Sequence, residues 1–150
     1  MEPTFESLSL SPPLLAVVGA LGYTQPTPIQ AAGIPALLAG RDLIGQSKTG
    51  SGKTAAFALP ILERMDLGNR SVQALVLCPT RELCAQVARE VRTLGRGHAG
   101  LAVLEVVGGQ QGRPQREALE RGVHVVIGTP GRLLDHLQRR VMDVNALKTV

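Results

Sequence analysis

The sequence predicts an α/β fold in which a parallel sheet is covered by helices on both faces, and three observations predict it. Short, nearly continuous apolar segments alternate along the chain with segments in which apolar residues recur at helical spacing. The later apolar segments are rich in valine, as strands buried on both faces are. A glycine-rich turn at 47–54 also lies between a short apolar segment and a helical one. We therefore expect a doubly wound domain.

Two helices are expected before the glycine-rich turn. Ser11 followed by two prolines is typical of a helix start, because serine caps free N–H groups and proline lacks an N–H that the first turn leaves unpaired. Leu14, Val18 and Leu21 then share one helical face, and Gly22 is suited to the helix end. The second helix is expected over 27–40.

Strands and helices are expected to alternate over the remainder of the chain. The expected strands are 42–44, 72–78, 101–107 and 123–127, and the expected helices begin near Lys53, Thr80, Pro114 and Gly131. Pro60 is expected to kink the first of these helices or to end it early. The expected apolar stripes are Leu83, Val87, Val91 and Leu94 in one helix, and Leu133, Leu134 and Leu137 in the last.

Composition restricts the class of protein. Hydrophobic residues make up 44% and charged residues 19% of the 150 residues, which is typical of a folded protein rather than a disordered tail. No apolar run is long enough to span a bilayer, and the acidic N-terminus does not resemble a signal peptide. Cys78 and Cys84 show no metal-binding pattern. We therefore expect a cytoplasmic protein with two reduced thiols.

Charge and aromatic content bear on a nucleic-acid partner. A formal net charge of +4 fits a polyanionic partner, although many basic proteins have none. Two Phe, one Tyr and no Trp leave few rings on which bases could stack. Any nucleic acid would therefore be held by its backbone, with little dependence on sequence.

The segment 47–54 (SKTGSGKT) is predicted to bind nucleotide phosphates. Gly50 and Gly52 let successive N–H groups turn towards one anion, and the following helix adds the positive end of its dipole. Lys53 would reach the β- and γ-phosphates, and the Thr54 hydroxyl would ligate Mg²⁺. Ser47 stands where this pattern usually has Gly or Ala. Lys53 and Thr54 are the catalytic candidates within the nucleotide-binding set Ser47, Lys48, Thr49, Gly50, Ser51, Gly52, Lys53 and Thr54.

Four further segments resemble motifs of the DEAD-box ATP-dependent RNA helicases. Residues 22–30 (GYTQPTPIQ) are similar to the Q motif, 79–84 (PTRELC) to motif Ia, 108–109 (GG) to the GG motif and 129–132 (TPGR) to motif Ib. Cys84 replaces the alanine that is usual in motif Ia. The resemblance implies that 1–150 is an N-terminal RecA-like P-loop NTPase domain, with a Q motif region at 5–30 and a core at 31–150.

The same resemblance implies ligands and site residues. ATP and Mg²⁺ are the implied cofactors, and RNA and a second RecA-like domain are the implied partners. Gln30 would hydrogen-bond the adenine edge, Tyr23 would stack on the ring, Phe5 would support the motif, and Thr27 belongs to the same nucleotide-binding set. The implied RNA-binding residues are Pro79, Thr80, Arg81, Gly108, Gly109, Thr129, Pro130, Gly131 and Arg132.

The positions and residue types of the three later turns are compatible with these roles. Each of the three later turns follows a predicted strand, and open α/β sheets bind ligands at that edge. Arg81 and Arg132 add guanidinium groups, and Gly109 allows close approach. Singly, each turn is an ordinary strand-to-helix connection, and Gln30 alone is an ordinary exposed helix residue. The order and spacing of the three turns after the phosphate-binding turn favour function. Gln111, Arg113 and Arg116 are expected first as a solvated helix face and only second as residues close to RNA.

No predicted strand ends in an acid, although phosphate-loop ATPases need one to hold Mg²⁺. In the family this acid belongs to an Asp-Glu-Ala-Asp motif on a further strand, and residues 147–150 (LKTV) are similar to the start of one. We therefore expect a domain that is incomplete at its C-terminus and that alone hydrolyses ATP negligibly. Two alternatives stay open: a phosphate-loop NTPase of another class, and a non-enzymatic RNA-binding protein.

Overall fold

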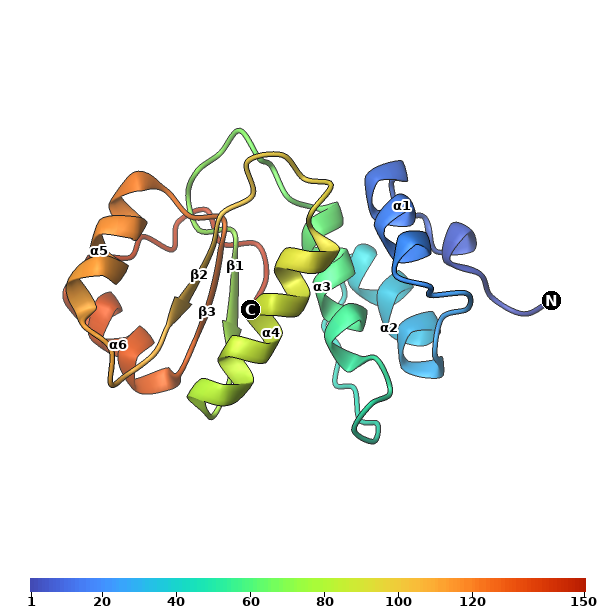
Figure 1. The fold of residues 1–150 in the computed structure, drawn as a ribbon, viewed down its shortest axis with the longest axis horizontal. Helices are drawn as coiled ribbons and strands as arrows, with labels where there is room; N and C mark the ends of the chain where they lie inside the picture. The colour runs from blue at the N-terminus through green and yellow to red at the C-terminus, as the bar shows by residue number, and fades with distance from the viewer. The chain divides into compact units, whose positions relative to one another are not determined.

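A computed structural model describes all 150 residues, Met1 to Val150 (Figure 1). By their internal contacts the residues form two compact units. The first unit is Met1–Met65 with Thr93–His98, and the second unit is Asp66–Arg92 with Ala99–Val150. In chain order the elements are the 3-10 helix η1 (Phe5–Leu8), α1 (Pro12–Ala20), α2 (Pro28–Leu38), α3 (Lys53–Glu63), β1 (Ala74–Leu77), α4 (Arg81–Leu94), β2 (Val103–Val106), α5 (Gly112–Arg121), β3 (Val125–Gly128) and α6 (Pro130–Gln138).

The first unit is a cluster of helices in which α2 packs along α3. Its core contains Leu14 from α1 and Leu59 from α3, both with no exposed surface. The Glu63 carboxylate accepts a hydrogen bond from the Ser11 N–H at 2.9 Å, which ties the start of α1 to the end of α3. The helix α3 continues past Pro60 and ends three residues later, at Glu63.

The second unit contains a parallel sheet in the order β1-β3-β2. Ala74 and Val103 both stand opposite Val125, so the three strands begin and end at the same levels. The central strand, β3, is buried along its whole length. The predicted parallel α/β fold is confirmed.

Helices cover both faces of this sheet. In Figure 1 α4 lies on one side of the strands, and α5 and α6 lie on the other. On the α6 side Leu133 packs against Val126 and Val106. On the α4 side Arg92 forms an ion pair with Glu105 of β2 at 3.3 Å. These contacts confirm the expected two-sided covering.

The expected strand at 42–44 is wrong. Residues 41–48 have no regular secondary structure, and Ile44 is fully exposed. A short apolar segment becomes a strand only where a neighbouring strand supplies hydrogen-bond partners, and no strand pairs with this one. Hydropathy alone does not carry that information.

Two of the expected apolar stripes need correction. In α4 the buried stripe begins with Cys84, which has no exposed surface, and not with the expected Leu83, which is 38% exposed. In α6 Leu134 and Leu137 are exposed, and the residue buried beside Leu133 is His136. A polar ring takes this position because a hydrogen bond satisfies one of its nitrogens, and the apolar pattern could not predict that.

We expect Ile127→Ala to lower the free energy of unfolding of the chain by about 2–5 kcal/mol, because the side chain is fully buried in the central strand. Ile44→Ala is the matched control, and we expect a change below about 0.5 kcal/mol since this side chain is fully exposed. Urea unfolding followed by circular dichroism measures both. Equal losses in the two variants would contradict the placement of these residues.

Candidate functional site

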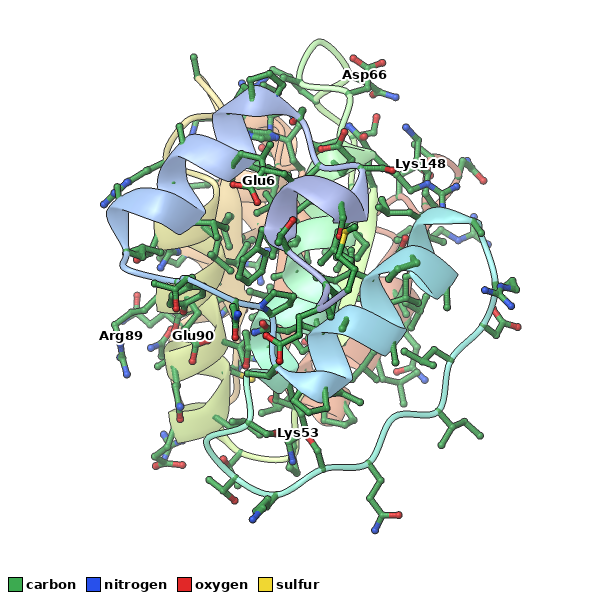
Figure 2. All side chains as sticks on the ribbon, turned by 90° about the vertical axis from the view of Figure 1, so that its right-hand side faces the viewer. Glu6, Lys53, Asp66, Arg89, Glu90 and Lys148 are labelled. Atoms are coloured by element: carbon green, nitrogen blue, oxygen red, sulfur yellow. The ribbon has the colours of Figure 1, made fainter.

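The glycine-rich turn leads directly into α3, and Figure 2 shows Lys53 at this junction. Gly50 and Gly52 adopt φ values of 79° and 81°, which favour glycine because a side chain there would be strained. The Lys53 Nζ donates a hydrogen bond to the Ser47 carbonyl oxygen at 2.7 Å. The lysine therefore folds back across the turn, and the hydroxyls of Ser47 and Ser51 are hydrogen-bonded to each other.

Gln30 is buried beside this turn, with only 3% of its surface exposed. Its Nε2 donates to the Gly52 carbonyl oxygen at 3.2 Å, and its Oε1 accepts from the Thr27 N–H at 3.0 Å. A Cβ at Gly52 would collide with the Gln30 amide, so the close approach also requires glycine. The alternative of an ordinary exposed helix residue is wrong for Gln30.

Two aromatic rings, those of Phe5 and Tyr23, lie near each other in the first unit. The ring centroids of Phe5 and Tyr23 are 6.2 Å apart. Phe5 is buried, whereas Tyr23 is 39% exposed, so the inner ring supports an outer ring that solvent can reach. The buried Thr27 Oγ1 lies at the start of α2, where it takes part in a capping box with Gln30.

In the second unit the three predicted turns come together. They line an open pocket of about 560 Å³ at the carboxyl ends of the strands, formed by Pro79, Thr80, Arg81, Glu82, Gly108, Gly109 and Thr129. This grouping follows from the sheet, because parallel strands of equal extent end at one edge. We call this edge, with 79–82, 108–110 and 129–132, the carboxyl rim.

Motif Ia and the glycine pair meet closely on this rim. The Thr80 Oγ1 accepts a hydrogen bond from the Leu83 N–H at 3.2 Å and so caps α4. The Arg81 guanidinium lies over Gly109, with Nη1 only 2.5 Å from where a Cβ would stand. Gly109 also has a φ of 79°, whereas a Cβ at Gly108 would meet nothing within 4 Å. Only the second glycine of the pair is therefore required by the geometry.

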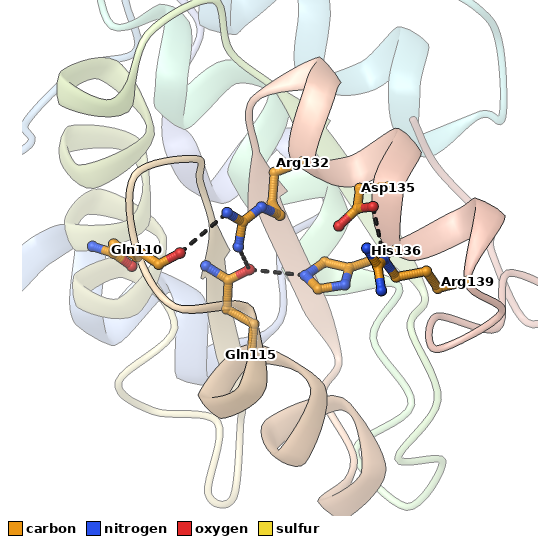
Figure 3. Close-up of polar contacts among 6 residues, drawn as sticks. All are labelled: Gln110, Gln115, Arg132, Asp135, His136 and Arg139. Atoms are coloured by element: carbon orange, nitrogen blue, oxygen red, sulfur yellow. Dashed lines mark hydrogen bonds and ion pairs between the residues drawn. The ribbon is translucent and has the colours of Figure 1, made fainter.

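Arg132 of α6 reaches across the rim rather than into solvent (Figure 3). Its guanidinium donates to the Gln110 carbonyl oxygen at 3.1 Å and to the Gln115 Oε1 at 3.3 Å. The Gln115 Oε1 also accepts from the His136 Nε2 at 2.8 Å. Burial, with Arg132 nearby, lowers the pKa of His136, so its ring is neutral at neutral pH.

Gln115 and His136 were absent from the predicted site residues. Both are buried, at 4% and 0% exposure. A glutamine and a histidine within amphipathic helices carry no sequence signal that separates them from solvated residues. Of the basic residues in α5, Arg113 pairs with Glu117 at 3.0 Å, as expected for a solvated helix face.

Other classes of site find little support. Burial raises the pKa of both thiols, that of Cys84 to about 11, and no disulfide joins them. No group of three or more His, Cys, Asp or Glu side chains is placed to hold a metal ion. None of the helices combines the length and apolar character that crossing a bilayer requires.

Comparison with known proteins decides the family. Residues 27–150 match the family model described as DEAD/DEAH box helicase. The chain belongs to that family.

Similar DEAD-box proteins include curated bacterial RNA helicases. The chain is 49% identical to the ATP-dependent RNA helicase DeaD of Escherichia coli K12, over 97% of this chain and 23% of the relative. It is 49% identical to DbpA of the same strain, over 97% and 32%, and 46% identical to CshA of Bacillus cereus, over 98% and 28%. The chain thus spans about a quarter to a third of the length of these relatives.

Solved structures of DEAD-box proteins are similar to this one. A DEAD box protein from Methanococcus jannaschii aligns with a TM-score of 0.90 and 39% identity, over 96% of this chain and 39% of that one. Dbp5 of S. cerevisiae, bound to RNA and ADP BeF3, aligns with a TM-score of 0.84 and 33% identity, over 96% and 36%. These likenesses confirm the predicted fold class.

Gly109→Ala should destabilise the second unit by about 1–2 kcal/mol, because alanine is strained at positive φ and its Cβ displaces Arg81. The neighbouring Gly108→Ala is the control, with an expected change within about 0.5 kcal/mol. Urea unfolding of both variants provides the measurement. If Gly108→Ala proved the more damaging of the two, the described rim geometry would be wrong.

Proposed function

We propose that the chain is the ATP- and RNA-binding N-terminal part of an ATP-dependent RNA helicase. The relatives named DeaD, DbpA and CshA support this activity, and Dbp5, bound to RNA and ADP BeF3, supports both ligands. The observation that carries the proposal is the gathering of three motif turns around one pocket at the carboxyl rim.

In this proposal the turn at 47–54 holds the phosphates of ATP. The glycine conformations at 50 and 52 turn backbone N–H groups towards an anion. Lys53, whose Nζ now contacts the Ser47 carbonyl, would exchange this neutral acceptor for phosphate oxygens, which attract it more strongly. Lys48, Thr49 and Ser51 contribute through the backbone of the same turn.

Mg²⁺ fits this site as an ion held mainly by the nucleotide. Thr54, in the first turn of α3, is the one side chain that we propose as a ligand. Mg²⁺ keeps several waters and binds phosphate oxygens together with one or two carboxylates, so Thr54 would supply only part of the protein's share of its ligands. The ion would neutralise charge that develops on the phosphates.

The adenine would lie against Tyr23, which Phe5 supports from below. The Thr27 hydroxyl can donate a hydrogen bond to a ligand here, because in the capping box of α2 it acts only as an acceptor. The Gln30 amide is already engaged at both ends, but its oxygen has a second lone pair and its nitrogen a second N–H. Gln30 can therefore recognise adenine while it holds the turn.

The carboxyl rim would bind the RNA backbone. Arg81 and Arg132 supply guanidinium groups, and the starts of α4 and α6 supply free N–H groups at Thr80, Arg81 and Gly131. Gly108 and Gly109 have no side chains, so the RNA strand could approach the backbone of the rim closely. A second RecA-like domain would close on the bound RNA strand and bend it, and this bending would separate short duplexes. The protein would act in the cytoplasm.

Replacing Lys53 with Ala in the full-length gene product should reduce the kcat/KM of RNA-stimulated ATP hydrolysis by more than about 100-fold, because an aligned charge on the phosphates is lost. Lys148→Ala, a lysine outside the proposed site, is the control and should retain activity. A coupled ATPase assay and a duplex-unwinding assay measure the effect. Full unwinding by the Lys53→Ala protein would refute the proposed nucleotide site.

Arg81→Ala should weaken binding of single-stranded RNA equally for unrelated sequences, because Arg81 contacts the backbone only. The slope of log affinity against log salt should become shallower by about 0.7, the value for one phosphate contact. Fluorescence anisotropy across a salt series measures both quantities. Arg89→Ala, an exposed arginine on the same helix, is the control and should leave the slope unchanged; an effect restricted to one RNA sequence would contradict backbone binding.

A further inference from the structure

We propose that Gln115 is a positioning residue for RNA binding: its buried amide holds the Arg132 guanidinium over the glycine turn of the carboxyl rim. This inference rests on the proposed function. Gln115 is only 4% exposed, so it acts through Arg132 and not by touching RNA itself.

One side chain joins three segments of the second unit (Figure 3). The Gln115 Nε2 donates to the carbonyl oxygen of Val107, the residue directly after β2, at 3.1 Å. The Gln115 Oε1 accepts from Arg132 and from His136, both on α6. Arg132 in turn holds the Gln110 carbonyl oxygen at 3.1 Å, directly after the glycine pair. Strand end, glycine turn and α6 therefore share a single anchor.

The orientation of the amide is fixed by its partners. A carbonyl oxygen only accepts hydrogen bonds and a guanidinium only donates them. With the amide reversed, its oxygen would face the Val107 carbonyl and its nitrogen would face Arg132, so both contacts would become repulsive. The same orientation requires that the His136 Nε2 carries the proton. No other uncharged side chain of this shape offers a donor and an acceptor in these places.

The charges in this network explain why it suits an anion. Arg132 is held by two neutral oxygens and forms no ion pair, whereas the acid on the same helix, Asp135, pairs with Arg139 at 2.9 Å. A carboxylate at position 115 would have held the guanidinium equally well but would have neutralised it. An amide fixes the guanidinium in place and leaves its charge and its remaining N–H groups for phosphate.

A second guanidinium reinforces this site. The Nη1 atoms of Arg116 and Arg132 lie 3.0 and 3.3 Å from where a Cβ at Gly112 would stand, so both groups converge on the first residue of α5. Two like charges that approach each other repel, and a bound phosphate relieves the repulsion. The network thus brings Arg132 to a place where an anion is favoured.

The test is a double-mutant cycle on RNA affinity in the full-length gene product. Gln115→Met, which keeps the length of the side chain but removes both hydrogen-bonding groups, should weaken binding of single-stranded RNA by about tenfold. Arg132→Ala should weaken it at least as much. If Gln115 acts through Arg132, the double variant will bind as Arg132→Ala does, because residues that share one contact are not additive. Additive losses would overturn the inference.

A matched control separates positioning from general loss of stability. Gln73 is equally buried in the same unit, and its amide bonds the Asp66 and Asn69 carbonyl oxygens at 2.7 Å, next to the beginning of β1. Gln73→Met should destabilise the protein comparably and leave RNA affinity unchanged. A tenfold loss of affinity in this control as well would overturn the inference.

If Gln115→Met does not fold, the variant Arg132→Lys tests the same inference. Arg132→Lys keeps the charge at a half-buried position. A single ammonium group, however, cannot bridge the Gln110 and Gln115 oxygens as the two terminal nitrogens of a guanidinium do. We expect the RNA affinity of Arg132→Lys to lie within threefold of that of Arg132→Ala. An RNA affinity equal to that of the wild type in Arg132→Lys would overturn the inference. Failure of the proposed function is distinguishable, because the wild-type protein itself would then bind no RNA.

Discussion

The parallel pairing of β1, β3 and β2 is the constraint on which the rest of the second unit depends. All three strands run in the same direction in matched register, so their carboxyl ends lie at one edge. Each strand is followed there by a turn and then a helix, and each turn therefore presents N–H groups and side chains to the same space. The burial of β3 along its whole length fixes this arrangement, because any slip in register would move apolar side chains out of the core.

The first unit depends on a different constraint, which is backbone conformation. The glycine-rich turn needs positive φ at positions 50 and 52, and at 52 it also needs space for the buried Gln30 amide. Side-chain identity matters less in this turn than the absence of side chains. The lysine that follows can fold over the turn only because the turn brings a carbonyl within reach.

Much of this organisation could be predicted from the sequence. Valine-rich segments predicted β1, β2 and β3, and the glycine-rich turn and the start of α3 followed from local chemistry that needs no distant partner. The strand at 42–44 failed because strand formation depends on a neighbour in space. His136 and Gln115 were missed for a related reason: a polar residue inside a helix is recognised as buried only when its hydrogen-bond partner, here on another helix, is known. The same limit applied to Gln30, whose burial depends on the Gly52 carbonyl.

The two native cysteines have a practical consequence for work on this protein. Thiol reagents attack the thiolate, and both sulfurs are buried, with the pKa of Cys84 raised to about 11. The folded chain therefore presents no reactive sulfur to a maleimide dye at neutral pH. A single cysteine introduced on an exposed helix surface can carry such a dye selectively, without prior removal of Cys78 and Cys84.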